Sequence, residues 1–159
     1  MKLDDPMPKP PVIPGPAPKI LLIRAPYYGG IVDGMTSAAK QVLEAAHASV
    51  ESIEVAGAYE LPQALRLCVK APQKYDGFIA LGCVVRGETD HYEFICSATM
   101  DGLMNVALQH ALCLGTAVLT VDNLMQAQVR SHETGHNKGA EAAIACLKQI
   151  VIARQMASA

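Results

Sequence analysis

Short apolar runs alternate with segments of helical periodicity along most of this chain, and that alternation constrains the fold more than any other feature. Strands are predicted at residues 20–23, 50–55, 77–83 and 117–121, and helices at about residues 31–45, 62–71, 91–114, 124–131 and 138–156. Short apolar strands that are buried on both faces and separated by helices pair in parallel through right-handed crossovers. We therefore expect an α/β fold, with four parallel strands in the middle layer of a three-layer sandwich.

Proline is concentrated at the N-terminus, with seven prolines in the first 18 residues. A stretch this rich in proline forms neither a helix nor a central strand, because proline lacks the backbone N–H. We expect residues 1–18 to be a proline-rich arm, extended or disordered. Residues 19–159 are expected to form a single domain, since a hydrophobic share of 51% is ample for one core.

Charge and hydropathy argue against several classes of protein. The formal net charge is -2 and the two signs are interspersed, so neither nucleic acid nor an anionic membrane is an expected partner. We find no apolar run near the roughly 20 residues that span a bilayer, and no apolar centre of a signal peptide, so we expect a cytoplasmic protein. The five cysteines are widely spaced, and we interpret them as reduced thiols rather than disulfides or a metal site.

The most suggestive segment for function is residues 84–91, V-V-R-G-E-T-D-H, which follows a predicted strand and opens into a predicted helix. Amides at a helix start face outward and attract phosphate, and Gly87 would let a ligand approach the backbone. His91 is suited to proton transfer near neutral pH. The simpler explanation is an ordinary turn, with Asp90 and Glu93 capping the helix and His91 on the surface. Spacing alone does not decide between them.

Two further segments follow predicted strands at the same edge of the sheet, where ligands of parallel α/β proteins gather. Glu60 would accept hydrogen bonds from a polyhydroxylated ligand there, or simply stabilise the start of the next helix. Tyr27 and Tyr28 would either stack on a planar ring or cover the end of the sheet.

Residues 132–136, H-E-T-G-H, fit the sequence pattern of zinc peptidases. That pattern binds zinc only when both histidines lie one turn apart on a continuous helix. Here Gly135 falls inside the pattern, the stretch connects two predicted helices, and no third ligand is obvious beyond Glu141. We therefore expect no metal site.

The long predicted helix at residues 91–114 is apolar around most of its circumference. Such a helix has to be buried on several sides, whereas packing on one sheet buries only one side of it. We expect a homo-oligomer.

Together these segments resemble the 6,7-dimethyl-8-ribityllumazine synthase family. The similarity runs from about Lys19 to the C-terminus and rests on four blocks: G-A-Y-E-L-P at 57–62, L-G-C-V-V-R-G-E-T-D-H at 81–91, V-L-T at 118–120 and N-K-G at 137–139. The resemblance implies a flavodoxin-like three-layer α/β/α sandwich with a four-stranded parallel sheet. It also implies a transferase of riboflavin biosynthesis, which condenses 5-amino-6-ribitylaminouracil with 3,4-dihydroxy-2-butanone 4-phosphate without metal or organic cofactor, releasing phosphate and water.

The resemblance also implies which residues bind the substrates. They are the residues at the family's binding positions: Tyr27, Ala58, Tyr59, Glu60, Cys83, Val84, Val85, Glu88, Thr89, Thr116 and Arg130. Tyr27 would stack on the pyrimidine, and Ala58 and Glu60 would hold the ribityl chain. Backbone groups of Val84 and Val85 would meet the ring.

Catalysis is expected from His91, Arg130 and Lys138 on the same resemblance. His91 matches the family's proposed proton-transfer residue. Arg130 matches an arginine that grips the phosphate, with Lys138 at the same pocket, and both reach in from the neighbouring subunit. Glu88 and Thr89 match the phosphate-binding turn. The implied partners are the two substrates and other copies of the chain, in a homopentamer or higher assembly.

Thr116 departs from the family pattern, because many members present an aromatic residue there from the adjacent subunit. One side of the ring stack is therefore expected to be altered. The alternative from another class is a noncatalytic relative that binds flavin or lumazine, or forms a shell. Glu60, His91, Arg130 and Lys138 together argue against it, since a binding module has no use for a phosphate-gripping arginine paired with a proton-transfer histidine.

Overall fold

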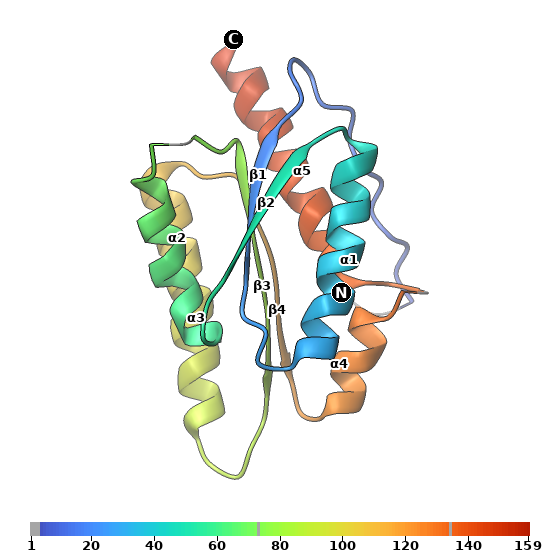
Figure 1. Ribbon diagram of the computed structural model, residues 1–159, viewed down its shortest axis with the longest axis vertical. Helices are drawn as coiled ribbons and strands as arrows, with labels where there is room; N and C mark the ends of the chain where they lie inside the picture. Colours follow the sequence, from blue (N-terminus) through green and yellow to red (C-terminus); the bar gives the residue numbers. More distant parts are fainter. Residues whose placement is uncertain (1–3, 73, 134) are drawn as a thin grey trace.

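A computed structural model describes residues 4–72, 74–133 and 135–159 of the chain (Figure 1). Four strands, β1 (Lys19–Arg24), β2 (Ser49–Glu54), β3 (Gly77–Val85) and β4 (Leu114–Val121), form one parallel sheet in the order β2-β1-β3-β4. The helices are α1 (Gly29–Ala45), α2 (Leu61–Val69), α3 (His91–His110), α4 (Leu124–Ser131) and α5 (Lys138–Ala157), with a short 3₁₀ helix, η1 (Ala58–Glu60), before α2. The predicted α/β fold with four parallel strands is confirmed.

Helices cover both faces of the sheet, with α2 and α3 on one face and α1, α4 and α5 on the other (Figure 1). Successive side chains of a strand point to opposite faces, so each strand supplies two cores. In β1, Ile20 and Leu22 are buried in the core that includes α1 and α5, whereas Leu21 and Ile23 are buried in the core that includes α2 and α3.

Strand β2 does not fit the expectation that every strand is buried on both faces. Most of its side chains are exposed, because β2 is an edge of the sheet and four of the six residues in its sequence, S-V-E-S-I-E, are polar. Glu51 of β2 pairs with Lys19, whose Nζ lies 3.4 Å from Glu51 Oε1. Charged side chains on an edge strand discourage pairing with further strands.

Two elements end at different residues than the sequence predicts. The helix predicted at residues 91–114 ends at His110, because Ala111 adopts a left-handed conformation with φ 50° and terminates it. Strand β3 runs beyond its predicted end to Val85, because its last residues continue the ladder with β4. The valines expected in a loop are therefore held in a strand.

The described part of the N-terminal arm, residues 4–18, forms neither a helix nor a strand. It is held against α5 by Arg154, whose Nη1 donates hydrogen bonds to the carbonyl oxygens of Pro14 (2.7 Å) and Pro16 (2.6 Å). Within the described residues, no helix is both long enough and apolar enough to cross a membrane.

Candidate functional site

A pocket of about 270 Å³, here called the edge pocket, opens at the carboxyl ends of β1 and β3. It is lined by six predicted site residues, Tyr27, Ala58, Cys83, Val84, Val85 and His91, together with Tyr28, Gly57 and Ile95. These residues come from the loop after β1, from Gly57 and η1, from the end of β3 and from the first turns of α3. The fold therefore gathers predicted residues from distant parts of the sequence around one small cavity.

The edge pocket combines an aromatic surface with a neutral thiol. Tyr27 is 75% exposed, and its ring meets Tyr28 edge to face with the centroids 5.0 Å apart. Tyr27 therefore retains a free surface on which a planar ligand can stack. Burial raises the pKa of the Cys83 thiol to about 11, so this sulfur is protonated at neutral pH and is no nucleophile.

Glu60 borders the edge pocket through Gly57. A Cβ added to Gly57 would lie 3.3 Å from Glu60 Oε2, so the carboxylate folds back over a residue of the pocket wall. Within the described residues, Glu60 makes no side-chain capping bond to the start of α2. Tyr59 is 59% exposed beside it.

The turn between β3 and α3 is braced by Arg86. Its Nε lies 3.0 Å from Asp122 Oδ1, its Nη1 lies 2.8 Å from Glu93 Oε1, and its guanidinium carbon lies 4.3 Å from the ring centroid of Tyr92. The brace joins the ends of β3 and β4 to the first turn of α3. Sequence reasoning missed Arg86, because no local spacing shows that Asp122 lies next to it.

The interpretation of Asp90 and Glu93 as a capping pair, the simpler of the two for this turn, is wrong. Glu93 binds Arg86 instead, and in the described part of the chain Asp90 makes no side-chain capping bond. The N–H of His91 donates to Thr89 Oγ1 at 3.4 Å, and this long hydrogen bond is a weaker substitute for the predicted cap of α3. Glu88 and Thr89 are exposed in this turn and do not line the edge pocket of their own chain.

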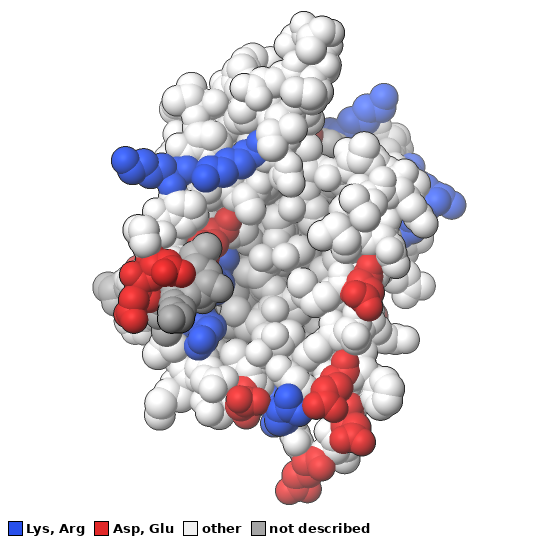
Figure 2. All heavy atoms as spheres, turned by 180° about the vertical axis from the view of Figure 1, so that it is seen from behind, with Lys and Arg blue, Asp and Glu red and all other residues white. Residues whose placement is uncertain are grey.

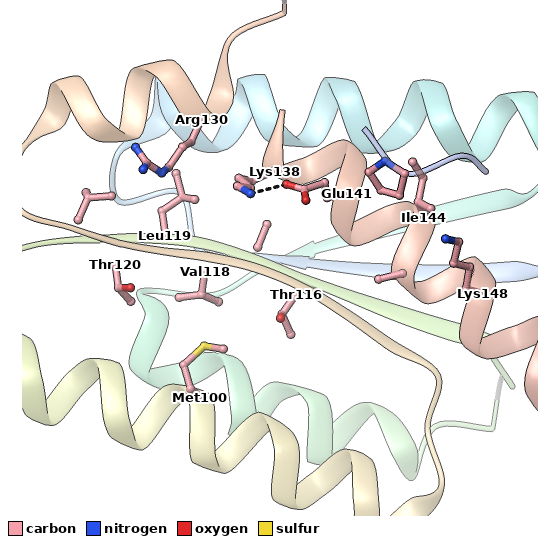
Figure 3. A pocket seen from close by; sticks show the side chains of 14 residues that line it. Met100, Thr116, Val118, Leu119, Thr120, Arg130, Lys138, Glu141, Ile144 and Lys148 are labelled. Carbon is pink, nitrogen blue, oxygen red and sulfur yellow. Dashed lines mark ion pairs between the residues drawn. The ribbon is translucent and has the colours of Figure 1, made fainter. Parts of the chain in front are cut away.

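Three further predicted residues line a second cavity of about 510 Å³, here called the β4 cleft, which runs along β4 between α3 and α5 (Figure 3). They are Thr116, Arg130 and Lys138. Figure 2 shows a hollow on the back of the molecule, with charged side chains mostly around its rim. Two separate cavities of one chain thus hold nine of the thirteen predicted residues, whereas Tyr59, Glu60, Glu88 and Thr89 line neither.

The β4 cleft is lined by three cationic side chains, Arg130, Lys138 and Lys148, and by one carboxylate, Glu141. Lys138 Nζ lies 2.7 Å from Glu141 Oε2, and this ion pair is the dashed line in Figure 3. Arg130 Nη1 donates to the carbonyl oxygen of Gln126 at 2.8 Å, which holds its guanidinium along α4. The excess of positive charge suits an anionic ligand.

The two histidines of the zinc-peptidase pattern do not share a helix. His132 is the residue after α4, and His136 lies two residues before α5. Their stretch is the connection between two helices that the sequence predicted. Among the residues that the structure describes, no group of three or more His, Cys, Asp or Glu side chains is arranged to hold a metal ion.

Comparison with known proteins gives one consistent result. A family model described as 6,7-dimethyl-8-ribityllumazine synthase matches residues 17–154. A 6,7-dimethyl-8-ribityllumazine synthase of Paramagnetospirillum magneticum is 38% identical over 144 residues, covering 87% of this chain and 96% of the relative. The enzyme of the same name from Azorhizobium caulinodans is 39% identical over 141 residues, covering 86% and 87%. A 6,7-dimethyl-8-ribityllumazine synthase 1 of Rhizobium meliloti is 37% identical, covering 86% and 92%.

Proposed function

The chain belongs to the 6,7-dimethyl-8-ribityllumazine synthase family, and from that premise we propose how its residues perform the family's reaction. The enzyme is a transferase of riboflavin biosynthesis. It forms 6,7-dimethyl-8-ribityllumazine from 5-amino-6-ribitylaminouracil and 3,4-dihydroxy-2-butanone 4-phosphate, with release of phosphate and water. Its place of action is the cytoplasm.

The edge pocket binds the pyrimidine in this proposal. Tyr27 stacks on the ring, and backbone groups of Val84 and Val85 meet the ring edge. Glu60, with Ala58, holds the ribityl chain, because a carboxylate accepts hydrogen bonds from several hydroxyl groups. The observation that carries the proposal is that Tyr27, Ala58 and the end of β3 meet around one cavity at the carboxyl end of the sheet.

The phosphorylated ketone binds where two chains meet. Arg130 and Lys138 of one subunit approach the exposed turn of Glu88 and Thr89 on its neighbour. All four residues bind the same phosphate. The separation of the two cavities within one chain supports a shared site. Thr116, exposed in the β4 cleft, offers the pyrimidine no aromatic partner for Tyr27, so the stack is one-sided.

The exposed face of α3 supplies the surface for the contact between subunits. Phe94, Met104 and Leu108 are 73%, 56% and 73% exposed in the single chain. Apolar side chains of this size are covered in a stable soluble assembly. The enzyme is a homopentamer or a higher assembly.

The chemistry needs proton transfer and orientation more than a strong nucleophile. Formation of the Schiff base, loss of phosphate and ring closure each move a proton, and His91 at the edge pocket serves this role. Arg130 and Lys138 stabilise the negative charge of the leaving phosphate. Holding the two substrates face to face supplies several kcal/mol of the rate enhancement.

One assay tests the proposed function. Purified protein is mixed with both substrates, and lumazine absorbance and phosphate release are followed together. We expect both signals to rise in equal amounts, and neither with one substrate alone. A noncatalytic relative would instead bind lumazine or flavin without turnover, and that result would refute the proposal.

A further inference from the structure

His136 is a buried side chain for which the proposed chemistry gives no role. Its side chain is only 4% exposed, and its Nε2 lies 3.1 Å from Glu141 Oε1. Among the described residues, neither ring nitrogen meets a partner in regular hydrogen-bond geometry. Burial of an unpaired imidazole is costly, so the close approach to the Glu141 carboxylate is the contact that stabilises it.

Glu141 divides its two oxygens between two partners. Oε1 faces His136, whereas Oε2 lies 2.7 Å from Lys138 Nζ. The side chains of Glu141 and Lys138 are 13% and 17% exposed, so the ion pair is largely shielded from water. A shielded carboxylate holds its cation strongly, and its orientation therefore fixes where the ammonium group lies.

We propose that His136 is a positioning residue for Lys138, acting through Glu141, and this rests on the proposed role of the β4 cleft in binding phosphate. With His136 occupying Oε1, only Oε2 is available to Lys138. The ammonium group has three N–H donors, so donors remain for a phosphate in the cleft. Without His136, the carboxylate turns both oxygens toward Lys138 and draws the ammonium group away from the ligand.

Arg130 is independent of this arrangement. Its guanidinium is held by the carbonyl oxygen of Gln126 on α4 and makes no ion pair with Glu141 among the described residues. Loss of His136 therefore weakens the part of phosphate binding that depends on Lys138 and leaves the part that depends on Arg130. That difference distinguishes a positioning role of His136 from general disruption of the connection between α4 and α5.

The test is a double-mutant cycle read by calorimetric titration of the assembled, full-length protein with inorganic phosphate. The variants are His136→Ala, Lys138→Met and the double variant. We expect His136→Ala to raise the phosphate Kd roughly three- to tenfold, the range for loss of one polar contact. In the Lys138→Met background the same change has no further effect, because the residue it positions is gone.

Three more variants keep the test decisive. His136→Gln retains a donor toward Glu141 and recovers most of the affinity. His136→Leu, which fills the buried site without a polar group, replaces His136→Ala in the cycle if that variant does not fold. His132→Ala, an exposed histidine of the same linker, is the matched control and binds phosphate like the wild type.

Equal phosphate affinity in the wild type and His136→Ala overturns the inference, as does an equal loss with and without Lys138. Unchanged affinity in Lys138→Met overturns it too, together with the proposed phosphate site. If the cycle shows the expected coupling but the wild type forms no lumazine, the proposed function fails and the positioning role stands.

Discussion

Gly139 packs so closely against Met35 that a Cβ on the glycine would overlap the Met35 carbonyl oxygen. The contact joins the first turn of α5 to the middle of α1. Asn137 completes the junction, since its side chain accepts from Gly139 N at 2.8 Å and donates to Gly34 O at 3.3 Å. Lys138 lies between Asn137 and Gly139 in the chain, so this packing sets where its backbone enters the β4 cleft.

Replacing Gly139 by alanine should therefore lower the free energy of unfolding by about 2 kcal/mol or more, because two packed helices have to separate. Urea unfolding at equal protein concentration measures the loss. Gly30→Ala is the control, since a Cβ there meets nothing within 4 Å and alanine favours the helix. Equal stability of the two variants would contradict the close contact.

Arg130→Lys should raise the KM for the ketone phosphate far more than the KM for the pyrimidine. Arginine grips a phosphate through two parallel N–H groups, which a lysine ammonium cannot reproduce. Steady-state kinetics with each substrate varied in turn measures the difference. If the KM for the ketone phosphate does not change, the phosphate is not held at Arg130.

His91→Ala should lower kcat by up to about 10²-fold with little change in either KM, because the imidazole transfers protons and does not hold a substrate. The same kinetic experiment reads this outcome beside the Arg130 variant. A rise in KM at constant kcat would instead assign His91 to binding.

Stability should decline at alkaline pH through the buried thiols. Burial raises the pKa of Cys83 to about 11 and that of Cys146 to about 12, from an ordinary 9.0. The folded state then keeps its protons where the unfolded state loses them, so the contribution is full below about pH 9 and is lost as pH rises toward the folded pKa values. Unfolding free energies across this window, with a smaller decline in Cys83→Ala, check the sign. A flat profile would show that these thiols do not contribute.

Leu108→Glu should dissociate the assembly and abolish turnover, because a charge on the apolar face of α3 prevents its burial between subunits. Analytical ultracentrifugation gives the size, and the lumazine assay gives the activity. Met156→Glu, on a comparably exposed apolar side chain of α5, serves as the control and keeps the wild-type size. A fully active Leu108→Glu monomer would refute the shared site.

The order of strands and helices could be predicted because apolar periodicity is a local property of the sequence. The exposure of β2 could not, since its place at the edge depends on which strands lie beside it. The same limit explains a side-chain contact that the sequence did not reveal. Arg86 meets Asp122 only because the ends of β3 and β4 come together.

In the candidate site, too, local features could be predicted from the sequence and contacts that depend on the fold could not. The pattern of residues 84–91 pointed to a ligand, and the fold gathers the end of β3 with Tyr27, Ala58 and His91 around one pocket. The capping pair failed, because a sequence pattern cannot show that Arg86 competes for Glu93. The roles of the predicted residues remain predictions that the kinetic experiments test.

The packing of α5 against α1 has a consequence for how the chain is made. Met35 and Leu43 of α1 are buried in one core with Leu147 and Ile150 of α5, near the other end of the sequence. During synthesis the apolar face of α1 leaves the ribosome long before the helix that covers it. The nascent chain therefore exposes an apolar surface until α5 emerges. Truncations that remove α5 should yield insoluble protein.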